Sequence, residues 1–138
     1  MFEIPEELVK LGIDRIDGFP VEGFVKGKGP KKPSILLIGE APGENEAIKG
    51  LPFIGRAGDE LNKSLESIGL TREDIYMTST VRSRPFVWRE KKVRNGELIQ
   101  RKYNRPPTQL EVIAHAPILD FEIQNIVHKI ILDEKQTA

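Results

Sequence analysis

Two stretches of the chain lack the usual alternation of apolar and polar residues. Residues 34–39 (SILLIG) are apolar on both faces, and residues 75–81 (IYMTSTV) are rich in β-branched and aromatic side chains. Strands buried on both faces are typical of parallel sheets, in which helices cover each side. The pattern therefore predicts a buried parallel strand over 34–39 and a second strand over 75–81. A third strand is predicted over 129–132 (KIIL).

Three other stretches show helical spacing of apolar residues. A short helix near the N-terminus begins close to Pro5, which suits a first turn. A second helix is predicted over 56–68, with Gly69 as its C-cap. A capping box from Thr108 to Glu111 begins a long third helix. The expected apolar stripe of this third helix consists of Val112, Ile113, Ala116, Leu119, Ile123 and Ile126.

The segments between these elements are rich in turn-forming residues. Glycine and proline dominate the end of the first 33 residues, and residues 40–55 are predicted to be a loop. Thr71 and Asp74 indicate a capped turn before the second strand. Asn95–Gly96 predicts a hairpin turn within residues 82–105.

This order of elements predicts an α/β fold with three α/β/α layers around a central, mainly parallel sheet. All 138 residues form one expected domain, with an N-terminal coil and short helix over 1–33, an α/β core over 34–132 and a hairpin insertion over 82–105. Three strands are few for such a sheet, so we expect it to be incomplete. The uncovered strand over 129–132 is a candidate surface for self-association.

Composition removes several classes of protein. The chain has no cysteine, which excludes disulfide frameworks and thiolate-bound metal sites. Its 21 basic and 21 acidic residues cancel, so overall charge indicates no partner. No apolar run approaches the ~20 residues of a spanning helix, and the N-terminus lacks an export signal. We expect a cytoplasmic protein without a membrane partner.

Two segments carry candidate chemistry. The loop after the first strand contains three acids, Glu40, Glu44 and Glu46, near the edge of the sheet where ligands bind. Such acids favour stabilisation of a developing cation over binding of a phosphate, and a plain solvated turn is the alternative. Residues 82–105 contain nine basic and two acidic residues with three aromatic rings among them. That net charge of +7 indicates a nucleic-acid contact, with a solvated hairpin as the alternative.

Phe53 lies in a glycine-rich loop, where an apolar ring either packs into the core or offers a stacking face. His115 falls on the apolar side of the long helix, which is typical of a structural histidine.

Five ordered segments together resemble the uracil-DNA glycosylases of the family 4 type. They are GEAPG at 39–43, GLPFIGRAG at 50–58, IGLTREDIYMT at 68–78, RSRP at 82–85 and RPPT at 105–108. The similarity runs from about residue 24 to residue 132. It implies a parallel sheet between helix layers, and hydrolysis of the N-glycosidic bond of uracil in DNA.

The resemblance also implies roles for single residues. Glu40 is expected to stabilise the cationic sugar, and Glu46 joins it in the catalytic set by supporting the loop. Phe53 is expected to stack on uracil, and Ser79 takes the base-reading position. The backbone lining the pocket is expected to come from Gly39, Ala41, Pro42 and Gly43. The expected DNA contacts are Arg56, Arg82, Arg84, Arg89, Lys91, Lys92 and Arg94, with the remaining basic residues up to Arg105.

Departures from the family pattern change some expectations. The four cysteines of an iron–sulfur cluster are missing, and Ser83 and His115 occupy two of their positions, so no cofactor is expected. Ser79 replaces an asparagine, and one hydroxyl cannot reproduce a paired donor and acceptor. A C-terminal His-Pro-Ser motif is absent, and His128 does not match it. A weak or inactive glycosylase is therefore expected, with non-catalytic nucleic-acid binding as the alternative.

Overall fold

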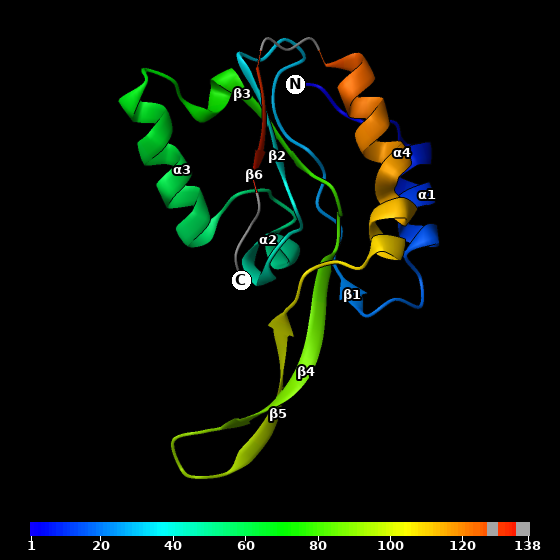
Figure 1. Ribbon diagram of the computed structural model, residues 1–138, viewed down its shortest axis with the longest axis vertical. Helices are drawn as coiled ribbons and strands as arrows, with labels where there is room; N and C mark the ends of the chain where they lie inside the picture. The colour runs from blue at the N-terminus through cyan, green and yellow to red at the C-terminus, as the bar shows by residue number, and fades with distance from the viewer. Residues whose placement is uncertain (127–129, 135–138) are drawn as a thin grey trace.

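The computed structural model describes residues 1–126 and 130–134, which form two three-stranded sheets and four α-helices among them (Figure 1). The elements are α1 (Glu6–Arg15), β1 (Val21–Glu22), β2 (Ile35–Gly39), α2 (Glu44–Lys49), α3 (Gly55–Ser67), η1 (Arg72–Asp74), β3 (Ile75–Ser79), β4 (Arg84–Lys92), β5 (Leu98–Asn104), α4 (Gln109–Asn125) and β6 (Ile130–Glu134).

The parallel sheet has the strand order β3-β2-β6. Ile35 of β2 pairs with Ile75 of β3 on one side and with Ile130 of β6 on the other. The predicted strands over 34–39 and 75–81 are thus confirmed as β2 and β3, although β3 ends two residues early. The predicted third strand corresponds to β6, and residues 128 and 129 lie outside the described part of the chain.

Helices lie on both faces of the parallel sheet (Figure 1). Ile35 and Leu37 pack with Leu65 of α3, whereas Leu36 and Ile38 pack with residues on the α4 side. Both faces of β2 are therefore buried, as its uninterrupted apolar sequence predicts. No helix of the described residues is long and apolar enough to cross a bilayer.

The buried face of α4 differs from the predicted apolar stripe. Ile113 is 51% exposed, whereas Glu111, His115 and Glu122 have no exposed surface. The prediction was wrong for Ile113, Glu111 and Glu122, whereas the burial of His115 agrees with its predicted place on the apolar side of the helix. Each buried polar group has a hydrogen-bond partner, which removes most of the cost of burial. The capping box from Thr108 to Glu111 is confirmed, with hydrogen bonds in both directions.

Pro117 lies inside α4 and cannot donate to the carbonyl of Ile113 four residues earlier. Arg15 of α1 donates its Nη2 to this carbonyl at 3.4 Å. Arg15 of α1 thus replaces the hydrogen bond to Ile113 O that Pro117 cannot make within α4.

The second sheet is antiparallel, with the order β1-β4-β5. Its β4–β5 hairpin extends away from the rest of the protein (Figure 1). The predicted turn is confirmed, since Gly96 has a φ of 88° and Asn95 Oδ1 accepts the N–H of Glu97 at 3.0 Å. The fold is mixed α/β. One of its two sheets is antiparallel, so a mainly parallel central sheet is not confirmed.

The segment after β2 is more ordered than predicted. Residues 40–55 were expected to be a loop, but α2 occupies Glu44–Lys49 within them. Gly50 ends this helix in the left-handed region, with a φ of 69°. Six residues give too short a periodic pattern to separate a helix from a polar loop.

Candidate functional site

The carboxyl ends of β2 and β3 lie side by side. Gly39 pairs with Ser79 in the sheet register. Beyond the sheet, Thr80 donates its N–H to Gly39 O at 2.9 Å, and Val81 donates to Glu40 O at 3.1 Å. The predicted positions from both strands are therefore brought to one edge, where open α/β sheets bind ligands.

Within this edge, Ala41 and Pro42 are buried and Glu40 is half-buried. No hydrogen bond or ion pair joins the Glu40 carboxylate to another described residue. Its oxygens are consequently available to a molecule from outside the protein.

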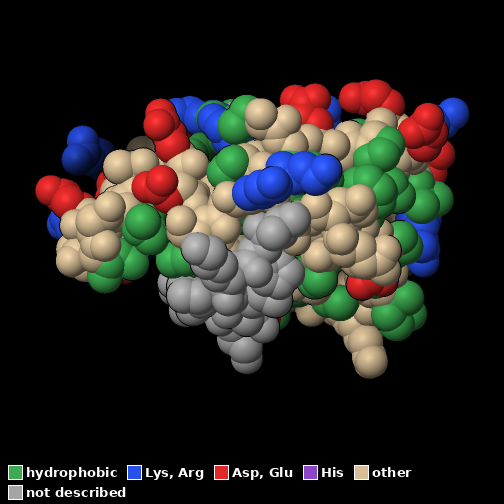
Figure 2. Space-filling model, turned by 90° about the horizontal axis from the view of Figure 1, so that it is seen from above, with side chains coloured by type: hydrophobic (Ala, Val, Ile, Leu, Met, Phe, Trp, Pro, Cys, Tyr) green, Lys and Arg blue, Asp and Glu red, His purple; other side chains and the backbone are tan. Residues whose placement is uncertain are grey.

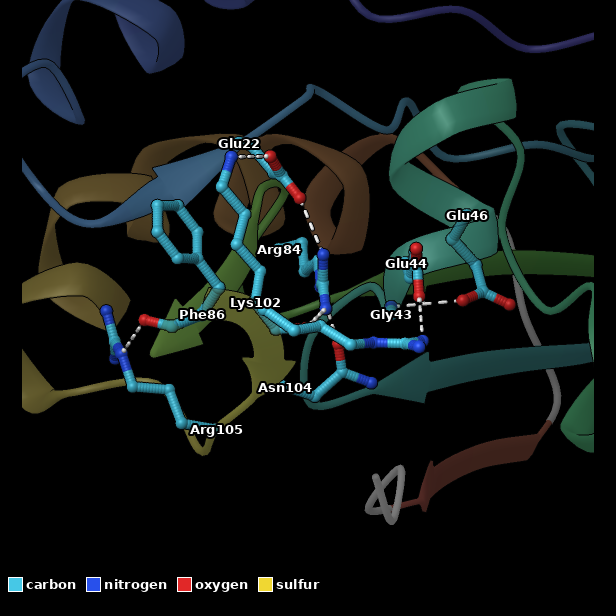
Figure 3. A network of polar contacts seen from close by, with 10 residues as sticks. Glu22, Gly43, Glu44, Glu46, Arg84, Phe86, Lys102, Asn104 and Arg105 are labelled. Carbon is cyan, nitrogen blue, oxygen red and sulfur yellow. Dashed lines mark hydrogen bonds and ion pairs between the residues drawn. The ribbon is translucent and has the colours of Figure 1, made fainter. Parts of the chain in front are cut away.

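Glu46 fixes the conformation of the loop that begins with Glu40. It lies on α2, is 7% exposed, and accepts the N–H of Gly43 at 3.0 Å through Oε1 (Figure 3). Its Oε2 accepts the N–H of Ile54, also at 3.0 Å. A Cβ on Gly43 would lie 2.9 Å from Glu46 Oε1, so this tight contact favours glycine. These two hydrogen bonds hold the loop in place, and the catalytic role expected of Glu46 stays a prediction.

Phe53 is 2% exposed and packs in the core cluster under α3, with Leu37, Leu65 and Met77 among its neighbours. Its φ of 49° is unusual for a residue with a side chain. Arg72 donates to the carbonyl of Phe53 and thereby holds this backbone conformation. In this arrangement the ring packs into the core and offers no free face for stacking.

The hydroxyl of Ser79 also has a local partner. Its Oγ donates to the carbonyl of Val81 at 2.6 Å, and the residue is 6% exposed. This bond fixes the turn after β3 and uses the only hydrogen that the hydroxyl can donate.

Two arginines expected to contact DNA are buried instead. Arg82 has no exposed surface and pairs with Glu122. Arg84 is 3% exposed and donates to Glu22 and Asn104, each at 2.6 Å (Figure 3). Burial and these internal partners disfavour phosphate contacts by either arginine in this structure, and the expected DNA contacts of both stay predictions. Sequence indicates positive charge but not which arginines have internal carboxylate partners.

Most of the other predicted DNA-contacting residues are exposed, whereas Lys102 and Arg105 are partly buried and paired with Glu22 and Glu111. Arg56 lies in the first turn of α3, and four more lie on the hairpin or its turn: Arg89, Lys91, Lys92 and Arg94. On the end of the molecule opposite the hairpin, acidic and basic side chains are interspersed over the part that is not grey (Figure 2). The exposed basic charge of the hairpin therefore remains a candidate nucleic-acid contact.

His115 joins three parts of the chain. Its Nδ1 accepts the backbone N–H of Arg82 at 2.9 Å, and its Nε2 lies 3.0 Å from the carbonyl of Gly12. The Nδ1 contact assigns the proton to Nε2, which donates to that carbonyl. Burial lowers the pKa of His115, which favours the neutral imidazole. The predicted structural role of this histidine agrees with these contacts.

The positions expected for iron–sulfur ligands do not fit such a cluster. Ser83 is buried and supplies no thiolate, and both ring nitrogens of His115 already have partners. Across residues 1–126 and 130–134, no group of three or more histidine and carboxylate side chains is arranged to hold a metal ion.

Comparison with known proteins places this site in a family. The model of the uracil DNA glycosylase superfamily matches residues 26–132, which include β2, β3 and the loop between Gly39 and Gly43. The chain belongs to this superfamily. The resemblance carried by the five ordered sequence segments is thereby confirmed.

Several curated members of the uracil DNA glycosylase superfamily are similar to the chain. A Type-4 uracil-DNA glycosylase of Saccharolobus solfataricus is 39% identical over 109 residues, covering 78% of this chain and 43% of that protein. One of Archaeoglobus fulgidus is 50% identical over 62 residues, covering 45% and 31%. The chain thus spans less than half the length of these relatives.

Two carboxylates of this superfamily member were not singled out from sequence. Glu22 accepts from Arg84 at 2.6 Å and from Lys102 at 2.7 Å, which anchors the hairpin to β1. Burial alone would raise the pKa of Glu22, but these two cations hold it below its ordinary value. Glu122 is the second carboxylate, and it lies outside the predicted apolar stripe, so no feature of the sequence indicates its burial.

Proposed function

We propose that the chain excises uracil from DNA at the carboxyl ends of β2 and β3. The carboxylate of Glu40, which has no hydrogen bond or ion pair with another described residue, is the observation that supports the proposal most directly. The name shared by the relatives, Type-4 uracil-DNA glycosylase, supports the same activity. The proposal includes a three-layer α/β/α core with the β3-β2-β6 sheet as its central layer.

In the proposed reaction the bond between sugar C1′ and uracil N1 breaks, and its electron pair leaves with the uracil. The sugar becomes cationic as the bond stretches, and the negative Glu40 carboxylate stabilises it. The oxygen of a water molecule then bonds to C1′, and Glu40 orients this water and accepts its proton. The flipped base has to enter a site whose loop Glu46 keeps in place.

The test is uracil release from a labelled single-stranded oligonucleotide, with the protein in excess. The chain is expected to release uracil above the buffer blank. Glu40→Gln should lower the rate about 10²- to 10⁴-fold, the range typical of a lost acid–base group. The matched control is Glu60→Gln, which removes an exposed carboxylate from α3 and should leave the rate unchanged. Equal rates for Glu40→Gln and the control would contradict the role of Glu40.

Nucleic-acid binding without cleavage is a second candidate function. Its supporting observation is the burial of Phe53, whose ring offers no face to a base in this structure. Salt-sensitive DNA binding that Glu40→Gln leaves unchanged, together with no uracil release by the unmodified chain, would favour this function over excision. DNA is the proposed partner in both cases, and self-association through β6 stays a prediction.

A further inference from the structure

A hollow of about 470 Å³ lies between the hairpin and α2, separate from the residues around Glu40. Trp88 of β4 and Ile48 of α2 supply apolar surface, while Arg84, Arg101 and Lys102 supply positive charge. None of the five residues from Gly39 to Gly43 lines it.

The apolar side chains of the hollow are unusually exposed for their size. Trp88 is 55% exposed and Ile48 is 75% exposed. The Trp88 ring is held edge-on by Phe86, with ring centroids 6.1 Å apart and an interplanar angle of 83°. Lys102 Nζ lies 5.2 Å from the centroid of the Trp88 ring. An exposed, fixed aromatic ring beside a cation is typical of surfaces on which unpaired nucleobases stack.

The charges around the hollow leave one cation in excess. Glu22 is shared by Arg84 and Lys102 (Figure 3). Glu44 is the partner of Arg101. Because three cations face two carboxylates, the lining carries a net charge of +1. The Arg101–Glu44 pair is 3.7 Å long, with side chains 45% and 49% exposed, so solvent screens it strongly. Arg101 can therefore exchange this weak partner for a phosphate.

We propose that this hollow binds one nucleotide of single-stranded DNA. The base lies against Trp88 and Ile48, and its phosphate pairs with Arg101 near Lys102. A single strand is required because a duplex stacks the faces of its bases on one another and leaves none for Trp88. The choice of DNA as the polymer rests on the proposed function, and the hollow would hold a nucleotide away from the target base.

Trp88 is the only tryptophan of the chain, so its emission reports on the hollow alone. The chain is titrated at low salt with a short thymidine oligonucleotide that contains no uracil. Trp88 emission is expected to change saturably along the same isotherm that anisotropy of a labelled oligonucleotide gives. Trp88→Ala should weaken anisotropy-detected binding about tenfold and Trp88→Phe less, since phenylalanine retains a stacking face.

Arg101→Gln tests the phosphate contact and should weaken binding several-fold. Lys63→Gln on α3 removes one exposed charge elsewhere and serves as the matched control. The urea midpoint of each variant shows that it folds, since the substituted side chains are all substantially exposed.

Oligonucleotide binding without any change in Trp88 emission would overturn the proposal, as would no binding at low salt. Thymidine monophosphate binding as tightly as the oligonucleotide would show a free-nucleotide site and would also overturn it. An emission change without uracil release leaves the hollow standing while excision fails. Uracil release without an emission change would overturn the nucleotide site in the hollow while supporting excision.

Discussion

The guanidinium of Arg82 and the carboxylate of Glu122 form an ion pair in which neither side chain has exposed surface. Glu122 also accepts from the hydroxyl of Tyr76 at 2.6 Å and from Thr78 Oγ1 at 2.8 Å. Burial, with Glu122 as a negative neighbour, raises the pKa of Tyr76 and keeps its hydroxyl a donor. On Arg82, Nε and Nη1 have no partner among the described residues. Both oxygens of the Glu122 carboxylate thus have hydrogen-bond partners, whereas two nitrogens of the Arg82 guanidinium have none among the described residues.

Removing the carboxylate should destabilise the fold strongly. Glu122→Gln leaves the Arg82 charge buried without compensation, which typically costs about 3–5 kcal/mol. The free energy of unfolding in urea measures this loss. Glu60→Gln, on the exposed face of α3, is the control and should stay within about 0.5 kcal/mol of the original chain.

The double variant Arg82→Met with Glu122→Gln should recover part of that loss. It removes the uncompensated charge. The glutamine oxygen can replace one carboxylate oxygen as acceptor from Tyr76 or Thr78, and its amide N–H can donate to the other hydroxyl. A single variant Glu122→Gln as stable as the control would contradict the buried pair.

Protonation of His115 should make stability depend on pH near neutrality. Its pKa in the folded state lies below the ordinary 6.5, so the unfolded chain binds a proton more readily. The contribution of neutral His115 to the free energy of unfolding is therefore fully present above about pH 6.5. It decreases as the pH falls toward the folded pKa, by at most about 1.4 kcal/mol per pH unit. Glu111 contributes to stability in a lower pH range. Burial alone would raise its pKa, but Arg105 and Thr108 hold the folded pKa below the ordinary 4.5, so this contribution is lost only below about pH 4.5.

His115→Asn separates this effect from other titrations. The amide oxygen of asparagine stands in for Nδ1 as acceptor of the Arg82 N–H but does not titrate. The difference in unfolding free energy between the two proteins should shift between pH 7.5 and 5.5, in favour of the variant at the lower pH. A constant difference over this range would show that His115 keeps its ordinary pKa.

The parallel strands, the hairpin turn and two capping boxes were predictable because each depends on local residue order. Gly96 and Thr108, for example, act on backbone within three residues of themselves. The polar core was not predictable, because Arg82 and Glu122 are 40 residues apart in the chain. The apolar pattern of α4 predicted a different buried face, and only the fold shows that Glu122 is buried opposite Arg82.

The candidate site divides in the same way. The strand pattern predicted that the loop of Glu40 begins at the edge of the sheet where ligands bind, and the register pairs the preceding Gly39 with Ser79. The roles of Glu40 and Ser79 stay predictions. The burial of Phe53 depends on long-range packing under α3, which the glycine-rich loop sequence does not reveal.

Phe53 provides a test that separates packing from stacking. Phe53→Ala should cost about 3–5 kcal/mol of stability, because it leaves a cavity under α3. Phe53→Leu fills most of that volume and should cost far less. If the ring serves the core alone, Phe53→Leu releases uracil at nearly the rate of the original chain. A large loss of uracil release with a small change in the urea midpoint would instead show that the ring contacts the base.

The two faces of the hairpin should differ in their contribution to DNA binding. Cross-strand pairing puts Arg89 opposite Arg101 and Lys91 opposite Ile99, so Arg89 and Lys91 share one face of β4 without an acid, while Arg101 pairs with Glu44. On the other face, Glu90 stands between Trp88 and Lys92. The double variant Arg89→Gln, Lys91→Gln should make the negative slope of log affinity against log salt shallower by about 1.4 for single strands.

The matched control for that double variant removes two exposed lysines elsewhere, Lys10 on α1 and Lys63 on α3. Its slope should equal that of the original chain, because neither helix belongs to the hairpin. Fluorescence anisotropy at a series of salt concentrations measures both slopes. Equal slopes for the two double variants would mean that the hairpin contributes only general charge, and Arg89 and Lys91 would then contact no phosphate.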